Sequence, residues 1–204
     1  MTFADLLAEP GVEEVLELRS PFGFLAFHGG SLERVTDVVA AEAARRSGSS
    51  LYAVIQPVGL RRHLPSTEVR PDASPSLALF LEHVRVAVAV HGYGREGWWT
   101  RLLLGGSNRS LAHHLAGQLA GVLPDYDVVH DLDVIPRELR GIHPRNPVNL
   151  PLDGGVQLEL PPRVRALTPQ WSGWEGPGLA PPTESLVVGL AAAATSWAPP
   201  HWST

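Results

Sequence analysis

Two histidines that follow apolar segments are the residues of this sequence most suited to chemistry. His28 follows the segment GFLAF and precedes two glycines, and His91 follows VAVAV and precedes Gly92. Glu33 comes five residues after His28, beyond the two glycines. Two imidazoles and one carboxylate are a ligand set of catalytic zinc ions, with water in the fourth position. The types and spacing of these residues therefore suggest a metal-dependent hydrolytic site.

Each histidine alone has a simpler interpretation. A histidine after an apolar run is usually a hydrogen-bonded strand end and not a ligand. The repeated His-Gly context and the nearby acid favour the metal site, because glycine allows the tight turns that bring metal and substrate close to the backbone. The pattern by itself leaves both interpretations open.

The segment GVQLELP offers an acid for catalysis. In a strand, Gln157 and Glu159 share one face, opposite the face of the flanking apolar residues. If the strand is central, the Glu159 carboxylate must meet a cation or a metal-bound water, because an unpaired buried carboxylate is costly; if the strand is exposed, it is only solvated. Beside a metal ion, Glu159 could take a proton from water and return it to a leaving nitrogen.

A substrate carboxylate would need a cation, and an arginine can bind it through two parallel hydrogen bonds. The arginines near the candidate acid in sequence are Arg137, Arg140, Arg145, Arg163 and Arg165.

The elements that must position these groups alternate between strand and helix. Strands are predicted at residues 22–27, 50–56, 85–92, 100–107 and 155–161, and helices at 31–48, 77–84, 108–123 and 184–197. This order predicts an α/β fold of three layers (α/β/α) with a mixed, mostly parallel central sheet. In such sheets ligands bind at the carboxyl ends of the strands, so we expect His28 and His91 to meet at one edge.

The composition limits the class of protein. The 204 residues are 44% hydrophobic and 18% charged, and no apolar run approaches the roughly 20 residues that span a bilayer. Since the chain has no cysteine, a metal site must use His, Asp and Glu. The formal charge of −5, without a long basic cluster, argues against nucleic-acid binding.

The domain organisation is predicted from the order and composition of the segments. We expect a single domain over residues 1–204, with a Pro- and Trp-rich C-terminal extension from about residue 168. The acidic N-terminus lacks the pattern of a secretory signal, so we expect a cytoplasmic protein with no membrane partner. The sequence does not predict the oligomeric state.

Several segments together resemble the phage-type and bacterial poly-γ-glutamate hydrolases, zinc peptidases related in fold to the zinc carboxypeptidases. The matching segments are FHGGSLERVTDVVAAEAA, RRHLPSTEV, VAVAVHGYG, LLLGGSN and NPVNLPLDGGVQLELPPRVR. The resemblance implies a Zn²⁺ ion bound by His28, Glu33 and His91, with Glu159 as general base and acid. It also implies hydrolysis of a γ-glutamyl amide bond in a small peptide or an anionic polymer.

The resemblance further suggests which residues contact substrate. These are His63, Gly105, Gly106, Asn146 and Asn149, together with Arg163 and Arg165 in the last matching segment.

Two positions depart from the family pattern. Leu64 and Pro65 separate His63 from the Ser-Thr pair that follows, and Leu150 follows Asn149 where the family usually has arginine. The loss of this cation weakens the case for a polyanionic substrate more than the case for hydrolysis. Two alternatives therefore stay open: a non-catalytic binding or regulatory module that keeps the fold, and a purely structural metal site with no adjoining cleft.

Overall fold

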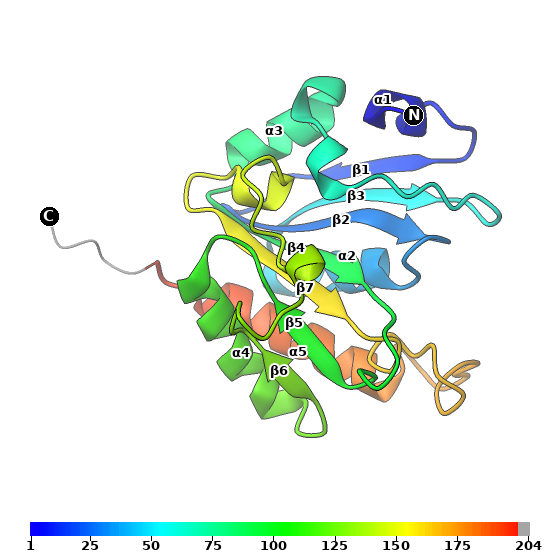
Figure 1. Ribbon diagram of the computed structural model, residues 1–204, viewed down its shortest axis with the longest axis vertical. Helices are drawn as coiled ribbons and strands as arrows, with labels where there is room; N and C mark the ends of the chain where they lie inside the picture. Colours follow the sequence, from blue (N-terminus) through cyan, green and yellow to red (C-terminus); the bar gives the residue numbers. More distant parts are fainter. Residues whose placement is uncertain (200–204) are drawn as a thin grey trace, which may run out of the picture.

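One seven-stranded sheet organises the chain, as the computed structural model in Figure 1 shows. The structure describes residues 1–199, so the end of the predicted C-terminal extension, residues 200–204, lies outside the described residues. In spatial order the strands are β1 (Glu13–Glu17), β3 (Ser50–Gln56), β2 (Phe22–Gly30), β4 (Val86–Gly92), β7 (Gly155–Leu160), β5 (Arg101–Leu104) and β6 (Asp127–Val129).

The direction of the strands determines which residues share an edge. Strands β3, β2, β4 and β7 are parallel to one another, β1 is antiparallel to β3, and the parallel pair β5 and β6 runs antiparallel to β7. The predicted α/β fold with a mixed, mostly parallel sheet is confirmed. The carboxyl ends of β2, β4 and β7 therefore lie together at one edge.

Helices cover both faces of this sheet. The helices are α1 (Phe3–Leu7), α2 (Thr36–Ser47), α3 (Pro75–His83), α4 (Arg109–Val122) and α5 (Pro181–Ser196). Helices α2, α4 and α5 pack on one face, where Phe24 and Val88 point, and α1 and α3 pack on the other, where Leu25 and Ala89 point. Figure 1 shows α4 and α5 side by side near β5 and β6, and α1 and α3 near β1. Because both faces are covered, the central strands are apolar almost throughout.

Three helices begin at other residues than predicted, and α3 begins at Pro75, two residues before the predicted start at 77. Helix α2 begins at Thr36 and not at residue 31, because residues 31–35 form a turn in which Val35 has a φ of 78°. Helix α4 begins as predicted, with the side chain of Asn108 accepting a hydrogen bond from the backbone of Leu111. Helix α5 begins at Pro181, before the predicted start at 184, and proline is well suited to a first helical position.

The two edge strands, β1 and β6, were not predicted from the sequence. Both are short, and three of the five residues of β1 (EEVLE) are glutamates, which are exposed at the edge of the sheet. The connections also contain four 3₁₀ turns, which are η1 (Ser66–Glu68), η2 (Pro71–Ala73), η3 (Arg137–Leu139) and η4 (Pro147–Asn149). Within residues 1–199, none of the helices has the length and apolar character required to cross a membrane.

Candidate metal centre and active site

Three neighbouring parallel strands carry the candidate site at their carboxyl ends. His28 lies in β2, His91 in β4 and Glu159 in β7. His91 and Glu159 are direct partners in the register of β4 and β7. Their separation in sequence is large, and the parallel pairing alone brings them together.

An irregularity in β2 turns His28 toward His91. Between Ala26 and Gly29 the register against β3 shifts, so that β2 contains one more residue than its partner. Strict alternation from Phe24 and Ala26 would direct His28 toward the α2 face, and a bulge of this kind redirects the side chain. The imidazole rings of His28 and His91 consequently lie 5.1 Å apart.

The turn before α2 places Glu33 between the two imidazoles. The backbone N–H of Glu33 donates to the carbonyl of His28 over 2.8 Å, which closes the turn. One carboxylate oxygen of Glu33 lies 2.8 Å from Nδ1 of His28, and the other lies 3.4 Å from Nδ1 of His91 and accepts the N–H of Gly92. Ligand atoms of the three side chains lie within 4.8 Å of one another.

The electrostatics of this cluster follow from its burial. Burial raises the pKa of Glu33, but the charge of His91 and the hydrogen bond from His28 outweigh it and hold the pKa well below its ordinary value. Burial acts to lower the pKa of His91, but the charge of the Glu33 carboxylate outweighs burial, so the pKa of His91 is raised. Glu33 is therefore a carboxylate at neutral pH, which is the form that binds a metal.

The hydrogen bonding of the imidazoles fits a metal ion. Nε2 of His28 lies 2.8 Å from the carbonyl oxygen of Leu64, which can only accept, so this nitrogen carries the hydrogen. Nδ1 can therefore donate to the Glu33 carboxylate only when the ring carries a second proton; in the neutral ring it presents a lone pair, and a cation between the two groups then makes the contact favourable. A ligating histidine that donates its other N–H to a carbonyl is the usual arrangement in metal sites. Nε2 of His91 is buried and has no hydrogen-bond partner among the described residues.

Glu159 lies beside this cluster in a buried central strand. Its side chain faces the same cavity as Gln157, while Val156, Leu158 and Leu160 lie in the core on the opposite face, as the alternation predicts. Nε2 of Gln157 donates to one carboxylate oxygen of Glu159 over 2.8 Å. Burial raises the pKa of Glu159, although the charge of His91 opposes this. The carboxylate is thus held by one hydrogen bond in an environment that increases its basicity.

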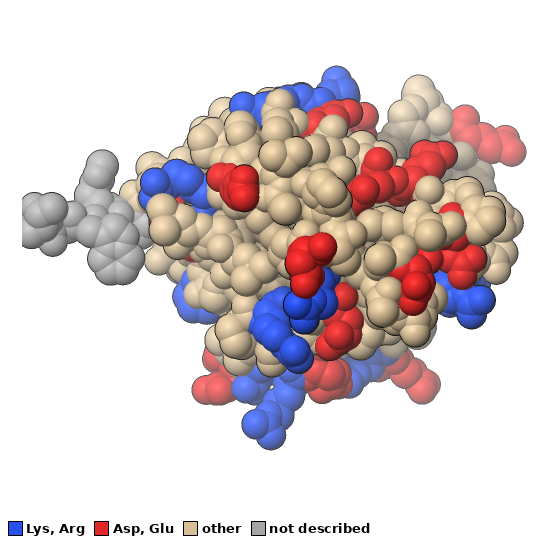
Figure 2. Space-filling view, turned by 90° about the horizontal axis from the view of Figure 1, so that it is seen from above, with Lys and Arg blue, Asp and Glu red and all other residues tan. Residues whose placement is uncertain are grey.

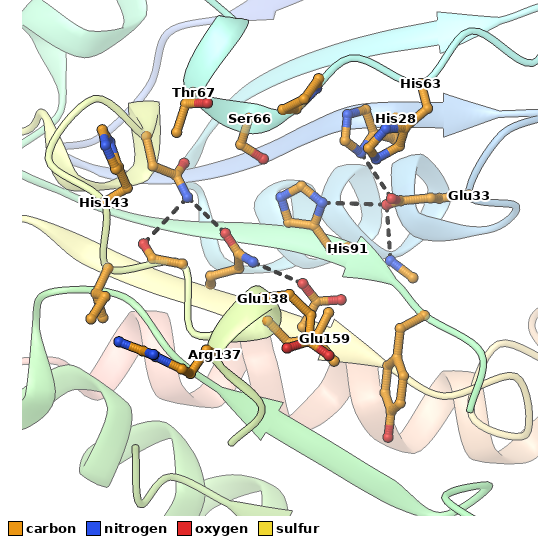
Figure 3. A pocket seen from close by; sticks show the side chains of 18 residues that line it. His28, Glu33, His63, Ser66, Thr67, His91, Arg137, Glu138, His143 and Glu159 are labelled. Atoms are coloured by element: carbon orange, nitrogen blue, oxygen red, sulfur yellow. Dashed lines mark hydrogen bonds and ion pairs between the residues drawn. The ribbon is translucent and has the colours of Figure 1, made fainter. Parts of the chain in front are cut away.

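A cavity of about 530 Å³ opens in front of these groups (Figure 3). Its remaining wall consists mainly of polar side chains from the connections, namely His63, Ser66, Thr67, Arg137, Glu138, His143 and Asn146. A purely structural metal site would have no adjoining cleft, and this cavity therefore argues against that alternative.

The structure brings two of the predicted substrate residues into the cavity. The ring of His63 lies 5.0 Å from that of His28, and Asn146 donates to the side chain of Gln157 over 2.7 Å. Asn149 lies outside the cavity lining: its amide donates to the carbonyls of Gly141 and His143, so it holds the loop together instead.

Arg163 and Arg165 do not lie in the cavity, contrary to the expectation for a substrate cation. The guanidinium of Arg163 lies 5.9 Å from the ring of Tyr126, in a separate cavity of about 250 Å³. Arg165 is buried and donates to the backbone carbonyls of Arg34 and Tyr93. Its guanidinium also fills the space that a Cβ at Gly92 would need.

Gly105 and Gly106 also have a different role from the expected one. They do not line the cavity; a Cβ at Gly105 would overlap the carbonyl group of Arg140. Gly106 has a φ of +84°, and its N–H donates to that carbonyl over 2.7 Å. The two glycines make room for the backbone of a neighbouring loop, and not for substrate.

Substitution of Gly105 should therefore destabilise the protein. In Gly105→Ala the added methyl group must displace the Arg140 carbonyl, and overpacking of this kind costs about 1–3 kcal/mol. Gly117→Ala is the matched control, because Gly117 lies in α4 with open space around it, where alanine is the better helix former. Urea unfolding of both variants measures the effect. Equal stability of the two would contradict this account of Gly105.

Several residues of the cavity wall were not predicted from the sequence. Ser66 and Thr67 lie within a segment quoted for the resemblance, but the structure was needed to place η1 opposite β4. His143 lies in the irregular loop before β7, where no periodicity points to a site. The positions of these side chains depend on loop packing, which local sequence patterns do not predict.

Comparisons with known proteins identify a family and related folds. A model of a family described as poly-gamma-glutamate hydrolase matches residues 4–170. The structure of a bacteriophage poly-gamma-glutamate hydrolase has 24% identity, with 89% of this chain and 87% of that chain covered and a TM-score of 0.73. The structure "YNDL-apo (Zinc-free)" has 20% identity, coverage of 91% and 90%, and a TM-score of 0.71.

A more distant fold relative is a gene product from Agrobacterium tumefaciens, with 12% identity, coverage of 91% and 94%, and a TM-score of 0.53. The search of curated proteins found no match. At these levels of identity the structural likenesses establish the fold.

Proposed function

Since the chain belongs to the poly-gamma-glutamate hydrolase family, as its sequence segments predict, we propose that it is a zinc-dependent hydrolase of γ-glutamyl amide bonds. The observation that carries the proposal is the meeting of three potential metal ligands and one buried carboxylate at the wall of a single cavity. The substrate we propose is a γ-glutamyl peptide or polymer.

We propose His28, Glu33 and His91 as the ligands of the zinc ion. When bound, zinc would supply a Lewis acid that polarises the scissile carbonyl and lowers the pKa of a water molecule. The hydrogen bond from His28 to the Leu64 carbonyl fixes the orientation of that imidazole, and the N–H of Gly92 fixes the Glu33 carboxylate. Both contacts hold the ligands in place before a metal ion arrives.

Glu159 is the proposed general base and acid. One of its oxygens accepts the hydrogen bond from Gln157, which leaves the other available to the attacking water. Glu159 takes a proton from the water as the oxygen attacks the amide carbon, and it returns the proton to the nitrogen as the C–N bond breaks. The products are a carboxylate and an amine. Burial supports this role, because it raises the proton affinity of the carboxylate.

Removal of the metal should abolish hydrolysis. After treatment with a chelator, the protein should release no amine from γ-glutamyl oligomers, and added Zn²⁺ should restore the activity where Mg²⁺ does not, because imidazole ligands suit zinc. Elemental analysis of the untreated protein should find about one zinc ion per chain.

Oligomers with α-linked glutamate are the control substrate for the linkage. If the zinc-loaded protein binds γ-glutamyl oligomers without cleaving them, the hydrolase proposal fails and the non-catalytic binding module takes its place. If the protein binds no zinc at all, the proposed ligand set fails as well.

A further inference from the structure

The charge of the molecule raises the question of how an anionic substrate is held. The chain carries a formal charge of −5, and Leu150 follows Asn149, so that no arginine stands at that position. Figure 2 shows acidic and basic side chains interspersed over one face, without a broad basic surface. An anionic substrate must therefore be attracted by a local arrangement of charge inside the cavity.

Arg137 is the one Arg or Lys among the described residues that line the cavity. It forms no ion pair with an acid of the described part of the chain, and the neighbouring carboxylate of Glu138 is already paired with Arg95 at 2.7 Å. In Figure 3, Arg137 lies at the opposite end of the cavity from the cluster of His28 and Glu33. Its position leaves space for a substrate between the cation and the proposed metal site.

The other arginines of this region are engaged elsewhere. Arg140 donates through Nε to the carbonyl of Ile135, and Arg145 faces Glu68 at 3.8 Å outside the cavity lining. Arg163 and Arg165 lie against Tyr126 and the Tyr93 carbonyl, as described above. None of these four can reach the substrate without giving up a present contact or leaving its site.

The turn that carries Arg137 is anchored on both sides. Before it, Ile135 is 1% exposed in a small apolar cluster with Tyr93 and Leu103, and Leu139 packs against the same cluster from within η3. After it, the carbonyl of Arg140 accepts the N–H of Gly106. The backbone of Arg137 is thus fixed relative to β5, while its side chain is exposed toward the cavity.

We propose that Arg137 binds a carboxylate of the substrate and makes the enzyme selective for γ-glutamyl units with a free α-carboxylate. This inference rests on the proposed function and names its substrate determinant. With a divalent ion bound, the charges of Glu33 and Glu159 are balanced, and the Glu138–Arg95 pair is neutral. The cavity then has a net positive charge, which comes from Arg137. A planar guanidinium can hold a carboxylate through two charge-assisted hydrogen bonds.

The test uses two γ-glutamyl oligomers that differ only in their α-groups, free carboxylate in one and carboxamide in the other. The zinc-loaded wild type should prefer the carboxylate by about 10- to 100-fold in kcat/KM, mainly through KM, as expected for a hydrogen-bonded charge pair. Arg137→Gln should lose this preference, and Arg137→Lys should keep part of it. Arg145→Gln, which removes a nearby arginine outside the cavity, should retain the full preference.

The outcomes separate this inference from the proposed function. Equal cleavage of both oligomers by the wild type, or an unchanged preference in Arg137→Gln, would overturn the role of Arg137 and leave the hydrolase intact. If neither oligomer is cleaved, the proposed function fails, and calorimetric binding of the same two oligomers decides the role of Arg137. A carboxylate preference in binding that Arg137→Gln abolishes supports it, and any other binding result overturns it.

Discussion

Glu159→Gln should lower kcat for γ-glutamyl hydrolysis by about 10²–10⁴-fold, the usual contribution of a general base. The amide has almost the shape of the carboxylate but cannot take a proton from water. Its carbonyl oxygen can still accept the hydrogen bond from Gln157, so the local packing should survive. Because burial disfavours the charged carboxylate, the neutral side chain should not reduce the free energy of unfolding.

The matched control is Glu138→Gln, which removes a carboxylate from the same cavity. Glu138 is exposed and paired with Arg95, and it has no contact with the proposed ligands, so kcat should change only slightly. Rates of amine release and zinc content should be measured for both variants. An active Glu159→Gln variant with full zinc content would remove Glu159 from the mechanism. Equal losses of kcat in both variants would indicate that the rate depends on the negative charge of the cavity and not on a general base.

The double variant His28→Ala, His91→Ala should lose both zinc and activity. It retains one of the three proposed ligands, and a single carboxylate cannot hold zinc in a protein site of this kind. Elemental analysis after purification without added metal should show zinc in the wild type and none in the variant, and hydrolysis should fall below detection.

The control for this experiment is the double variant His113→Ala, His130→Ala. These two imidazoles also lie against each other, with ring centroids 5.3 Å apart, but outside the cavity lining. This variant should keep its activity. Zinc in the His28/His91 variant at the wild-type level would contradict the proposed ligand set.

The His28/His91 variant should also be less stable than the wild type. Removal of both imidazoles leaves the Glu33 carboxylate, whose side chain is 13% exposed, without its ion-pair partners, and breaking a fully buried pair would cost about 3–5 kcal/mol. Glu33→Gln avoids this problem, because it removes a charge and retains the volume. Loss of zinc in a folded Glu33→Gln variant would support the site even if the double variant unfolds.

Much of the sheet and the candidate metal centre could be predicted from the sequence. Apolar runs identify β2, β4 and β7, and the alternation within residues 155–160 assigns Glu159 to the face opposite the core. These are local properties, since a strand buried on both faces must be apolar along its length. A histidine at the end of each of two parallel strands then implies a common edge.

The side chains that line the cavity could not be predicted in the same way. From the sequence, Arg137 was one of five candidate arginines, and Arg163 and Arg165, which lie in the last segment that resembles the family, were expected to contact substrate. The structure reverses this choice. The guanidinium of Arg165 packs against Gly92, outside the cavity lining, and Arg137 reaches the cavity from a loop more than 20 residues before Glu159. Loop packing depends on contacts between distant segments, which local periodicity does not record.

The sequence by itself thus determined the fold class and the kinds of residue at the centre, because burial and alternation act through neighbouring positions. The family followed from the resemblance of several segments, which the family match confirms. Only the tertiary structure decided how these residues meet. The extra residue in β2 turns His28 toward His91, and the Arg140 backbone against Gly105 and Gly106 sets the turn that bears Arg137. Both depend on pairings between separate strands and loops, and such pairings exist only once the chain has folded.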